Sequence, residues 1–350
     1  MKTIQQPLII GGGLSGLALA YFLKKKGIEA IVVEAADRLG GRIHTIAGLL
    51  GTPLELGATW FSNMHTNLLS LIEELQLLKF VQYSGGISFF QTKSFEPPQQ
   101  FFVPAAEQPS YRIAGGTQRL IEVLTERLLP EQILLQTKIL SIRDAATHLE
   151  VRRSDGSIMH AEQVIVCIPP QLAAASITFS PGLPGNVDEI LTTVQTWMAG
   201  TIKFTLEYSE PFWRKQGYSG MIYSHAGIVT EMYDHTNFEE NKYGFTGFLN
   251  GGSVHYSPTV RKELVLAQLC ELFGEQIIRP SLYMDKVWND ELIIKGNPVF
   301  VQPHQNNGHP LFSSGYLNDR LHFCGTETAD AFAGYMEGAV IAAKSIADKF

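Results

Sequence analysis

The sequence predicts an α/β fold in two units, with the segments of one unit at both ends of the chain. The first observation is a short apolar run, Leu8–Ile10, which leads through a Gly-rich turn into a helical pattern over Leu17–Lys26. The second is a set of alternating segments in the middle of the chain, typical of an antiparallel sheet. The third is a return to a buried strand, Leu321–Cys324, and a terminal helix, Gly334–Lys349. A discontinuous α/β domain with an inserted α+β domain accounts for all three observations.

The length supports this division. The chain has 350 residues, and at about 150 residues per domain it should form two domains. We expect the first domain to comprise residues 1–80, 111–178 and 298–350. The inserted domain should comprise residues 81–110 and 179–297, because Pro and Gly cluster near residue 180 and alternating segments follow them.

Composition narrows the class of protein. The formal net charge is −7, which argues against general nucleic-acid binding, because such domains are usually basic. The three cysteines form no C-x-x-C pair, so neither a disulfide framework nor a cysteine-built metal site is expected. The N-terminus does not resemble a secretory signal, and prolines interrupt the longest uncharged run, Gln163–Val187. We expect a soluble, cytoplasmic protein with no metal, no nucleic-acid partner and no membrane span.

The elements between the two ends follow from apolar periodicity. We expect helices at Met64–Lys79, Gly115–Leu129 and Pro258–Leu272, and strands at Ala30–Glu34, Gln132–Arg143, Leu149–Arg153, Gln163–Ile168, Thr201–Tyr208, Gly220–Tyr223, Gly227–Tyr233 and Tyr243–Leu249. The segment Tyr83–Ser110 is rich in aromatic residues and should form an irregular excursion of short strands. Its phenylalanines are candidates to line a pocket, although aromatic residues at such density are more often simple core: Phe89, Phe90, Phe95, Phe101 and Phe102.

The Gly-rich turn has the spacing of a dinucleotide-binding fingerprint, Gly11-x-Gly13-x-x-Gly16. Gly11 allows the tight turn, Gly13 lets the backbone approach a pyrophosphate, and Gly16 lets the helix pack on the strand. The N-terminus of the helix offers free N–H groups and the positive end of the helix dipole to the phosphates. Because strand, turn and helix are all present, the motif predicts a Rossmann-like nucleotide site.

An acidic residue ends the second strand of this unit. Glu34 follows the last glycine of the fingerprint at the distance where a carboxylate accepts hydrogen bonds from ribose hydroxyls. A second Gly pair and two arginines come directly after it, in Glu34-Ala35-Ala36-Asp37-Arg38-Leu39-Gly40-Gly41-Arg42. This run resembles the signature of the flavin-containing amine oxidases, and it favours FAD over NAD. In that setting Arg42 would offer a charged fork to phosphate.

The resemblance to the flavin-containing amine oxidase family, in a short monoamine oxidase-like form, covers most of the chain. The matching segments are Glu55–Trp60, Tyr111–Leu120, Val164–Pro170, Gly200–Lys203, Pro211–Arg214, Phe323–Thr328 and Gly334–Ala339. The resemblance implies FAD-contacting positions at Gly11, Gly13, Leu14, Ser15, Gly16, Glu34, Ala35, Arg38, Gly41, Arg42, Gly57, Ala58, Thr59, Trp60, Ile139, Gly325, Thr326, Glu327, Gly334, Tyr335, Met336 and Ala339.

Three residues take catalytic roles by the same resemblance. Lys203 matches the lysine that holds a water near flavin N5 and helps the reaction with oxygen, although it could be a solvated strand lysine. Trp288 matches a residue packed at the flavin, although it could be a core tryptophan. Tyr335 matches one wall of an aromatic cage that steers an amine toward N5, since aromatic faces attract cationic nitrogen.

The sequence departs from the family pattern at three places, and these limit which family properties can be assigned to this chain. Asn297 stands where monoamine oxidases carry the cysteine that binds flavin covalently, so FAD should be non-covalent. Pro298 stands where the second cage tyrosine would be. The segment from Val81 to Ser110 is shorter than the family's helical insertion, and no membrane tail is expected.

The resemblance implies oxidation of the C–N bond of a primary or secondary amine to an imine. Oxygen would be the electron acceptor and hydrogen peroxide the product, so the expected partners are a small amine and O₂. Two alternatives stay open. One is a desaturase or porphyrinogen-type dehydrogenase on the same fold, and the other is a non-catalytic FAD-binding protein. The oligomeric state does not follow from the sequence.

Overall fold

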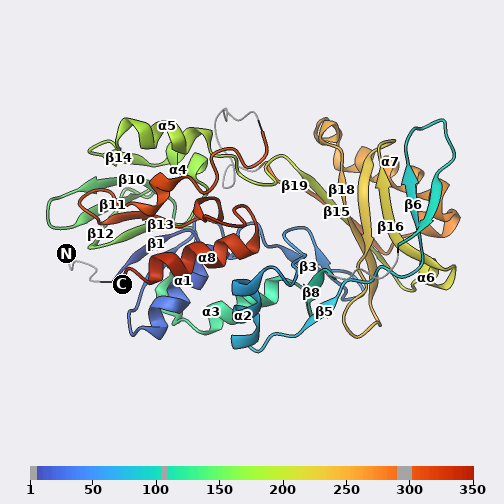
Figure 1. The fold of residues 1–350 in the computed structure, drawn as a ribbon, viewed down its shortest axis with the longest axis horizontal. Coiled ribbons are helices and arrows are strands. Elements are labelled where there is room, and N and C mark those ends of the chain that lie inside the picture. Colours follow the sequence, from blue (N-terminus) through green and yellow to red (C-terminus); the bar gives the residue numbers. More distant parts are fainter. Residues whose placement is uncertain (1–5, 104–108, 290–301) are drawn as a thin grey trace.

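The computed structural model describes residues 6–103, 109–289 and 302–350 and confirms a mixed α/β fold. Figure 1 shows a helix-covered parallel sheet toward one end of the molecule and a larger antiparallel-type sheet at the other. Two small two-stranded antiparallel sheets lie between them: β3 (Thr45–Ala47) with β4 (Pro53–Glu55), and β5 (Lys79–Val81) with β8 (Tyr111–Ile113). Among the described residues, no helix is both long and apolar enough to cross a bilayer.

The parallel sheet has five strands that come from both ends of the chain. Its order is β20 (Leu321–Phe323), β13 (Val164–Val166), β1 (Leu8–Ile10), β2 (Ile31–Val33) and β9 (Ile133–Leu134). Its three central strands are near-continuous apolar runs because both faces are covered. On the face that carries Ile9 lie four helices: α1 (Leu14–Lys25), α2 (Thr66–Glu74), α3 (Gln118–Glu126) and α8 (Met336–Ala347).

The opposite face of this sheet carries a four-stranded sheet and two helices. The strand order is β12 (Ile158–Ala161), β11 (Leu149–Arg153), β10 (Ile139–Asp144) and β14 (Thr178–Ser180). The helices are α4 (Pro170–Ser176) and α5 (Gly185–Thr193). Leu8 and Ile10 pack toward this layer, as strand alternation requires, while Ile9 packs toward the other.

The inserted domain was expected to start at residue 179, but residues after this position pack on the parallel sheet as part of this layer. Phe179, Val187 and Leu191 belong to the same apolar cluster as Leu8 of β1. The physical reason is helix α5, for which the sequence analysis made no prediction and whose apolar residues share one face. We propose that the inserted unit begins near residue 195 instead.

The larger sheet has seven strands. Its order is β19 (Leu282–Val287), β15 (Ile202–Tyr208), β18 (Tyr243–Leu249), β17 (Val229–Asp234), β16 (Tyr218–Ser224), β6 (Ile87–Gln91) and β7 (Gln99–Phe102). All neighbours are antiparallel except β16 and β6, which run parallel. Helix α7 (Pro258–Phe273), capped by Ser257, and the short helix α6 (Phe212–Lys215) pack into its core. The segment Tyr83–Ser110, expected to form short strands in an irregular excursion, thus supplies two strands that are ordered parts of this sheet.

Candidate functional site

One cavity of about 840 Å³ joins the parallel sheet to the seven-stranded sheet. It begins at the carboxyl ends of β1, β2 and β13, where open α/β sheets bind ligands, and reaches side chains of β15 to β18. Every residue assigned to FAD contact or to catalysis lines it, with one exception, Gly16.

Gly16 has the structural role predicted for it, which is to let the helix pack on the strand. A side chain at Gly16 would place its Cβ 2.0 Å from the carbonyl oxygen of Gly11, so only glycine lets α1 approach the strand. Gly11 adopts a φ of +113°, the tight turn that its place in the fingerprint predicts. Gly16 therefore lies behind the cavity wall and supports it.

The residues present fit a dinucleotide. Helix α1 begins at the cavity with Gly13 as its N-cap, no side-chain cap and no acidic residue in its first turn. Helix α8 also begins at the cavity, with Tyr335 as its N-cap and again no side-chain cap. Uncapped N–H groups at a helix N-terminus bind anionic groups, so these two ends suit phosphate and a flavin ring that becomes negative on reduction.

Glu34 lies at the end of β2, as the ribose role requires. Its Oε2 accepts a hydrogen bond from the Gly12 N–H at 2.6 Å, and its Oε1 accepts one from the Ala36 N–H at 2.8 Å. A carboxylate has about four acceptor sites, so these bonds fix its orientation and leave room for ribose hydroxyls.

The two arginines that follow Glu34 act within the protein. Arg38 donates to the carbonyl oxygens of Gly41 at 2.6 Å and Ile43 at 3.0 Å, which holds the second Gly-rich turn in shape. Arg42 forms an ion pair with the buried carboxylate of Glu327, with Nη1 2.6 Å from Oε1, and also donates to the Trp197 carbonyl. The Arg42 guanidinium group, which was expected to hold phosphate, is thus paired with Glu327. This pair connects the second Gly-rich turn to the segment after β20.

Lys203 is not a solvated strand lysine. Its side chain lies on the cavity with 3% of its surface exposed, and Nζ donates to the Gly57 carbonyl at 2.7 Å and to Thr59 Oγ1 at 2.5 Å. Nζ also lies 4.7 Å from the ring centroid of Trp60. Burial lowers the pKa of Lys203 to about 7, the Glu55 carboxylate opposes that shift, and Arg112 adds to it. The ammonium is therefore poised to change charge near neutral pH.

The other two residues assigned to catalysis also lie on the cavity. Trp288 is buried, and its indole N–H donates to the Leu56 carbonyl at 2.8 Å, which fixes the ring. Tyr335 is partly exposed and stacks against the imidazole of His304. Asn297 and Pro298 lie outside the described residues. Trp197 lines the cavity next to Tyr335, with ring centroids 5.9 Å apart.

The register of the large sheet places four cavity-lining residues, which were not singled out from the sequence, beside Lys203. Lys203 of β15 is paired with Lys286 of β19 on one side and Phe248 of β18 on the other. Phe248 is paired with Glu231 of β17, which is paired with Tyr223 of β16. These five side chains form one row across the sheet, and all of them line the cavity. Strand alternation could have marked them, but their alignment depends on strand pairing.

The five phenylalanines that were candidates either to line the pocket or to form simple core do not line this cavity. Phe89 is buried in the core of the large sheet instead. Phe95 and Phe102 point to solvent, with 79% and 68% of their surfaces exposed. The prediction was wrong because β6 and β7 lie at the far edge of the sheet, four and five strands from Lys203.

The fold and the cavity are those of a dinucleotide-binding protein, and side chains of the seven-stranded sheet complete the cavity. The family model described as flavin containing amine oxidoreductase matches residues 14–94 and 78–349. The chain belongs to this family, and flavin is its cofactor.

Individual relatives agree with this assignment. A probable flavin-containing monoamine oxidase A of Dictyostelium discoideum is 26% identical, over 97% of this chain and 96% of the relative. The flavin-containing amine oxidase B of Homo sapiens is 24% identical, over 97% of this chain and 85% of the relative.

Solved structures show the same fold. A putrescine oxidase bound to putrescine superposes with a TM-score of 0.85 at 21% identity, over 99% of both chains. A cyclohexylamine oxidase from Brevibacterium oxydans superposes with a TM-score of 0.84 at 20% identity, again over 99% of both chains.

Proposed function

We propose that this protein oxidises the C–N bond of a primary or secondary amine to an imine, with oxygen as electron acceptor and hydrogen peroxide as product. The observation that carries the proposal is the cavity that joins the Gly-rich turn and the start of α1 to buried Lys203 and the row beside it. A cytoplasmic location remains our proposal, supported by three cysteines that are all free thiols in the structure.

The cofactor would be held along the first part of the cavity. The N-terminus of α1 and Gly13 would receive the diphosphate, Glu34 the ribose, and the N-terminus of α8 the isoalloxazine ring. When bound, FAD supplies the redox chemistry by accepting a hydride from the amine carbon and passing the electrons to oxygen.

The chain's own residues would bind and orient the substrate. Trp60, Phe248 and Tyr335 present aromatic surface that attracts the amine nitrogen and excludes water. A cavity with few water molecules favours the neutral form of an amine, and only a neutral amine has the lone pair that drives loss of hydride. Lys203 holds its ammonium against Gly57 and Thr59, where a remaining N–H can hold a water or a proton.

Glu231 favours a substrate with a second amino group. It is the one carboxylate that the described strands of the large sheet place in the cavity, and its Oε2 lies 2.9 Å from the Tyr233 hydroxyl. Two strand spacings, about 10 Å, separate its strand from that of Lys203. The solved putrescine oxidase carries a diamine, and we propose a short diamine here as well.

A panel of amines tests both the amine oxidase activity and the narrower proposal of a diamine substrate. Anaerobic addition of the right amine should bleach the flavin, and aerobic turnover should release peroxide. For a diamine, Glu231→Gln should raise KM about tenfold, whereas a monoamine of the same chain length should be affected little. Equal effects on both would remove the diamine assignment but leave the amine oxidase standing.

The rival functions give different results. Flavin that stays oxidised with every amine would contradict the amine oxidase and favour a non-catalytic FAD protein. Reduction only by donors that lose hydrogen across a C–C bond or a ring would favour the desaturase or porphyrinogen-type alternative.

A further inference from the structure

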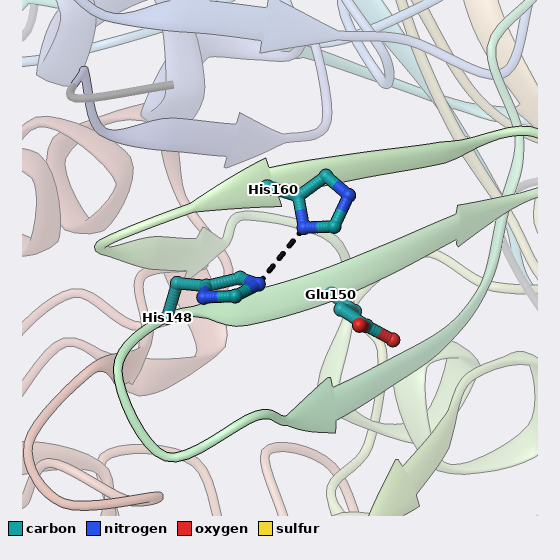
Figure 2. Close-up of side chains that lie close together, drawn as sticks. All are labelled: His148, Glu150 and His160. Atoms are coloured by element: carbon teal, nitrogen blue, oxygen red, sulfur yellow. Dashed lines mark hydrogen bonds between the residues drawn. The ribbon is translucent and has the colours of Figure 1, made fainter. Parts of the chain in front are cut away.

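Two histidines and a glutamate lie together on the small sheet behind the parallel sheet, away from the cofactor cavity. Figure 2 shows His148, Glu150 and His160 on neighbouring strands, with a hydrogen bond between the two imidazoles. Among the described ranges 6–103, 109–289 and 302–350, they are the one group of three or more His, Cys, Asp or Glu placed to share a metal ion.

The sheet register explains why these side chains meet. His148 directly precedes β11, and Glu150 follows two residues later, so both side chains point to the same face. His160 of β12 is the cross-strand partner of Glu150 and therefore shares that face. The spacing along the chain gives no sign of this cluster, so no metal site was expected from the sequence.

The geometry is close to that of a metal site. One ligand atom from each residue lies within 4.8 Å of the others, and His148 Nε2 is 2.8 Å from His160 Nδ1. Two imidazole nitrogens on a tetrahedral zinc ion are about 3.3 Å apart, so a small rotation of either ring would admit the ion. All three side chains are half-buried, which leaves a water access to a fourth position.

The groups around the cluster orient two of its members. The Thr147 hydroxyl lies 3.0 Å from His148 Nδ1, which holds the ring so that Nε2 faces the other ligands. Arg143 donates to Glu150 Oε2 from both Nε and Nη2, at 2.9 and 2.5 Å, which leaves Oε1 for a metal.

We propose that His148, Glu150 and His160 bind one Zn²⁺ ion, with water as the fourth ligand. Two imidazoles and a carboxylate form a donor set that zinc commonly uses. The ion would join β11 to β12 at the edge of the sheet and stabilise the folded chain, because it binds that state alone. Arg143 weakens the site, since its cation competes for Glu150.

Calorimetric titration of the full-length FAD-loaded protein with ZnCl₂, after chelator treatment, tests the site. We expect one ion per chain with a Kd in the micromolar range and a rise in Tm. His160→Asn and His148→Asn should each weaken binding at least tenfold, whereas Arg143→Gln should tighten it. His255→Asn, at an exposed histidine outside the cluster, is the matched control and should change nothing.

Each other result contradicts the proposal. Absence of binding at millimolar zinc would overturn it, as would binding that survives both histidine substitutions. Amine turnover of the zinc-loaded protein should equal that of the zinc-free protein, so the outcome does not depend on the proposed function.

Discussion

The indole of Trp197 stacks on the imidazole of His304, with ring centroids 4.1 Å apart and planes 20° from parallel. Tyr335 continues the stack, 5.8 Å from His304 and 18° from its plane. Backbone bonds hold the two loops together, since the Gln195 N–H donates to the Gln305 carbonyl at 3.0 Å. The wall that carries Tyr335 is therefore braced by the Trp197 loop, which lies more than 100 positions earlier in the sequence.

Trp197→Ala should loosen this wall and misplace the amine. We expect KM for the best amine to rise several-fold and kcat to fall, because a small displacement of the reacting atom is costly. Steady-state kinetics measures both. Trp197→Phe keeps an aromatic face and should recover most of the loss, whereas an unchanged Trp197→Ala enzyme would mean that substrate approaches from elsewhere.

Lys203→Met should separate the two half-reactions. Methionine keeps much of the apolar stem but removes the charge beside the cavity. Reduction of the flavin by substrate should change modestly, while its reoxidation by oxygen should slow about tenfold, a barrier increase of about 1.4 kcal/mol. Stopped-flow spectroscopy resolves the two steps, and equal reoxidation rates would assign Lys203 a purely structural role.

The reoxidation rate should also depend on pH. Because burial lowers the pKa of Lys203 to about 7, its ammonium form is lost as the pH rises through that value. The wild-type rate should fall over this range, and Lys203→Met should lose the dependence. Glu55→Gln removes the carboxylate that opposes the shift, so the midpoint should move to lower pH; a midpoint that stays in place would exclude Glu55 from this role.

Glu34→Ala should weaken retention of FAD. The variant loses the acceptors predicted for the ribose hydroxyls and also the bonds that shape the Gly-rich turn, at a cost of about 1–3 kcal/mol. Flavin content after gel filtration measures the effect. Glu29→Ala, at a polar residue off the cavity lining, is a suitable comparison and should keep its flavin.

FAD should leave the protein on acid precipitation. The reason comes from the sequence, where Asn297 replaces the residue that could attach flavin covalently. Absorbance of the supernatant and pellet after denaturation measures the distribution. A yellow pellet would show a covalent bond at some other residue.

Local patterns made the first half of the cavity predictable. The strand, the Gly-rich turn and the helix at Leu8–Lys25 are indicated by neighbouring residues alone, and they were found where the pattern indicated. The same holds for α7 and for β15, whose alternation is plain in the sequence.

The second half depends on contacts between distant segments. The row from Lys286 to Tyr223 exists only because four strand pairs adopt one register, and no local pattern fixes that register. Trp197 reaches the cavity through a loop whose partners, Gln305 and Asn307, follow more than 100 residues later. The Arg42–Glu327 pair likewise joins segments from opposite ends of the chain. The sequence therefore gives no sign that Glu327 engages the guanidinium group that was predicted to bind phosphate.

The pairing of β20 with β13 and the packing of α8 on α1 determine when the chain can bind its flavin during synthesis. The Gly-rich loop is translated before the Glu327 and Tyr335 side of the same pocket. A nascent chain therefore cannot enclose its flavin until β20 and α8 have been made. A message truncated before β20 would yield a protein unable to retain the coenzyme.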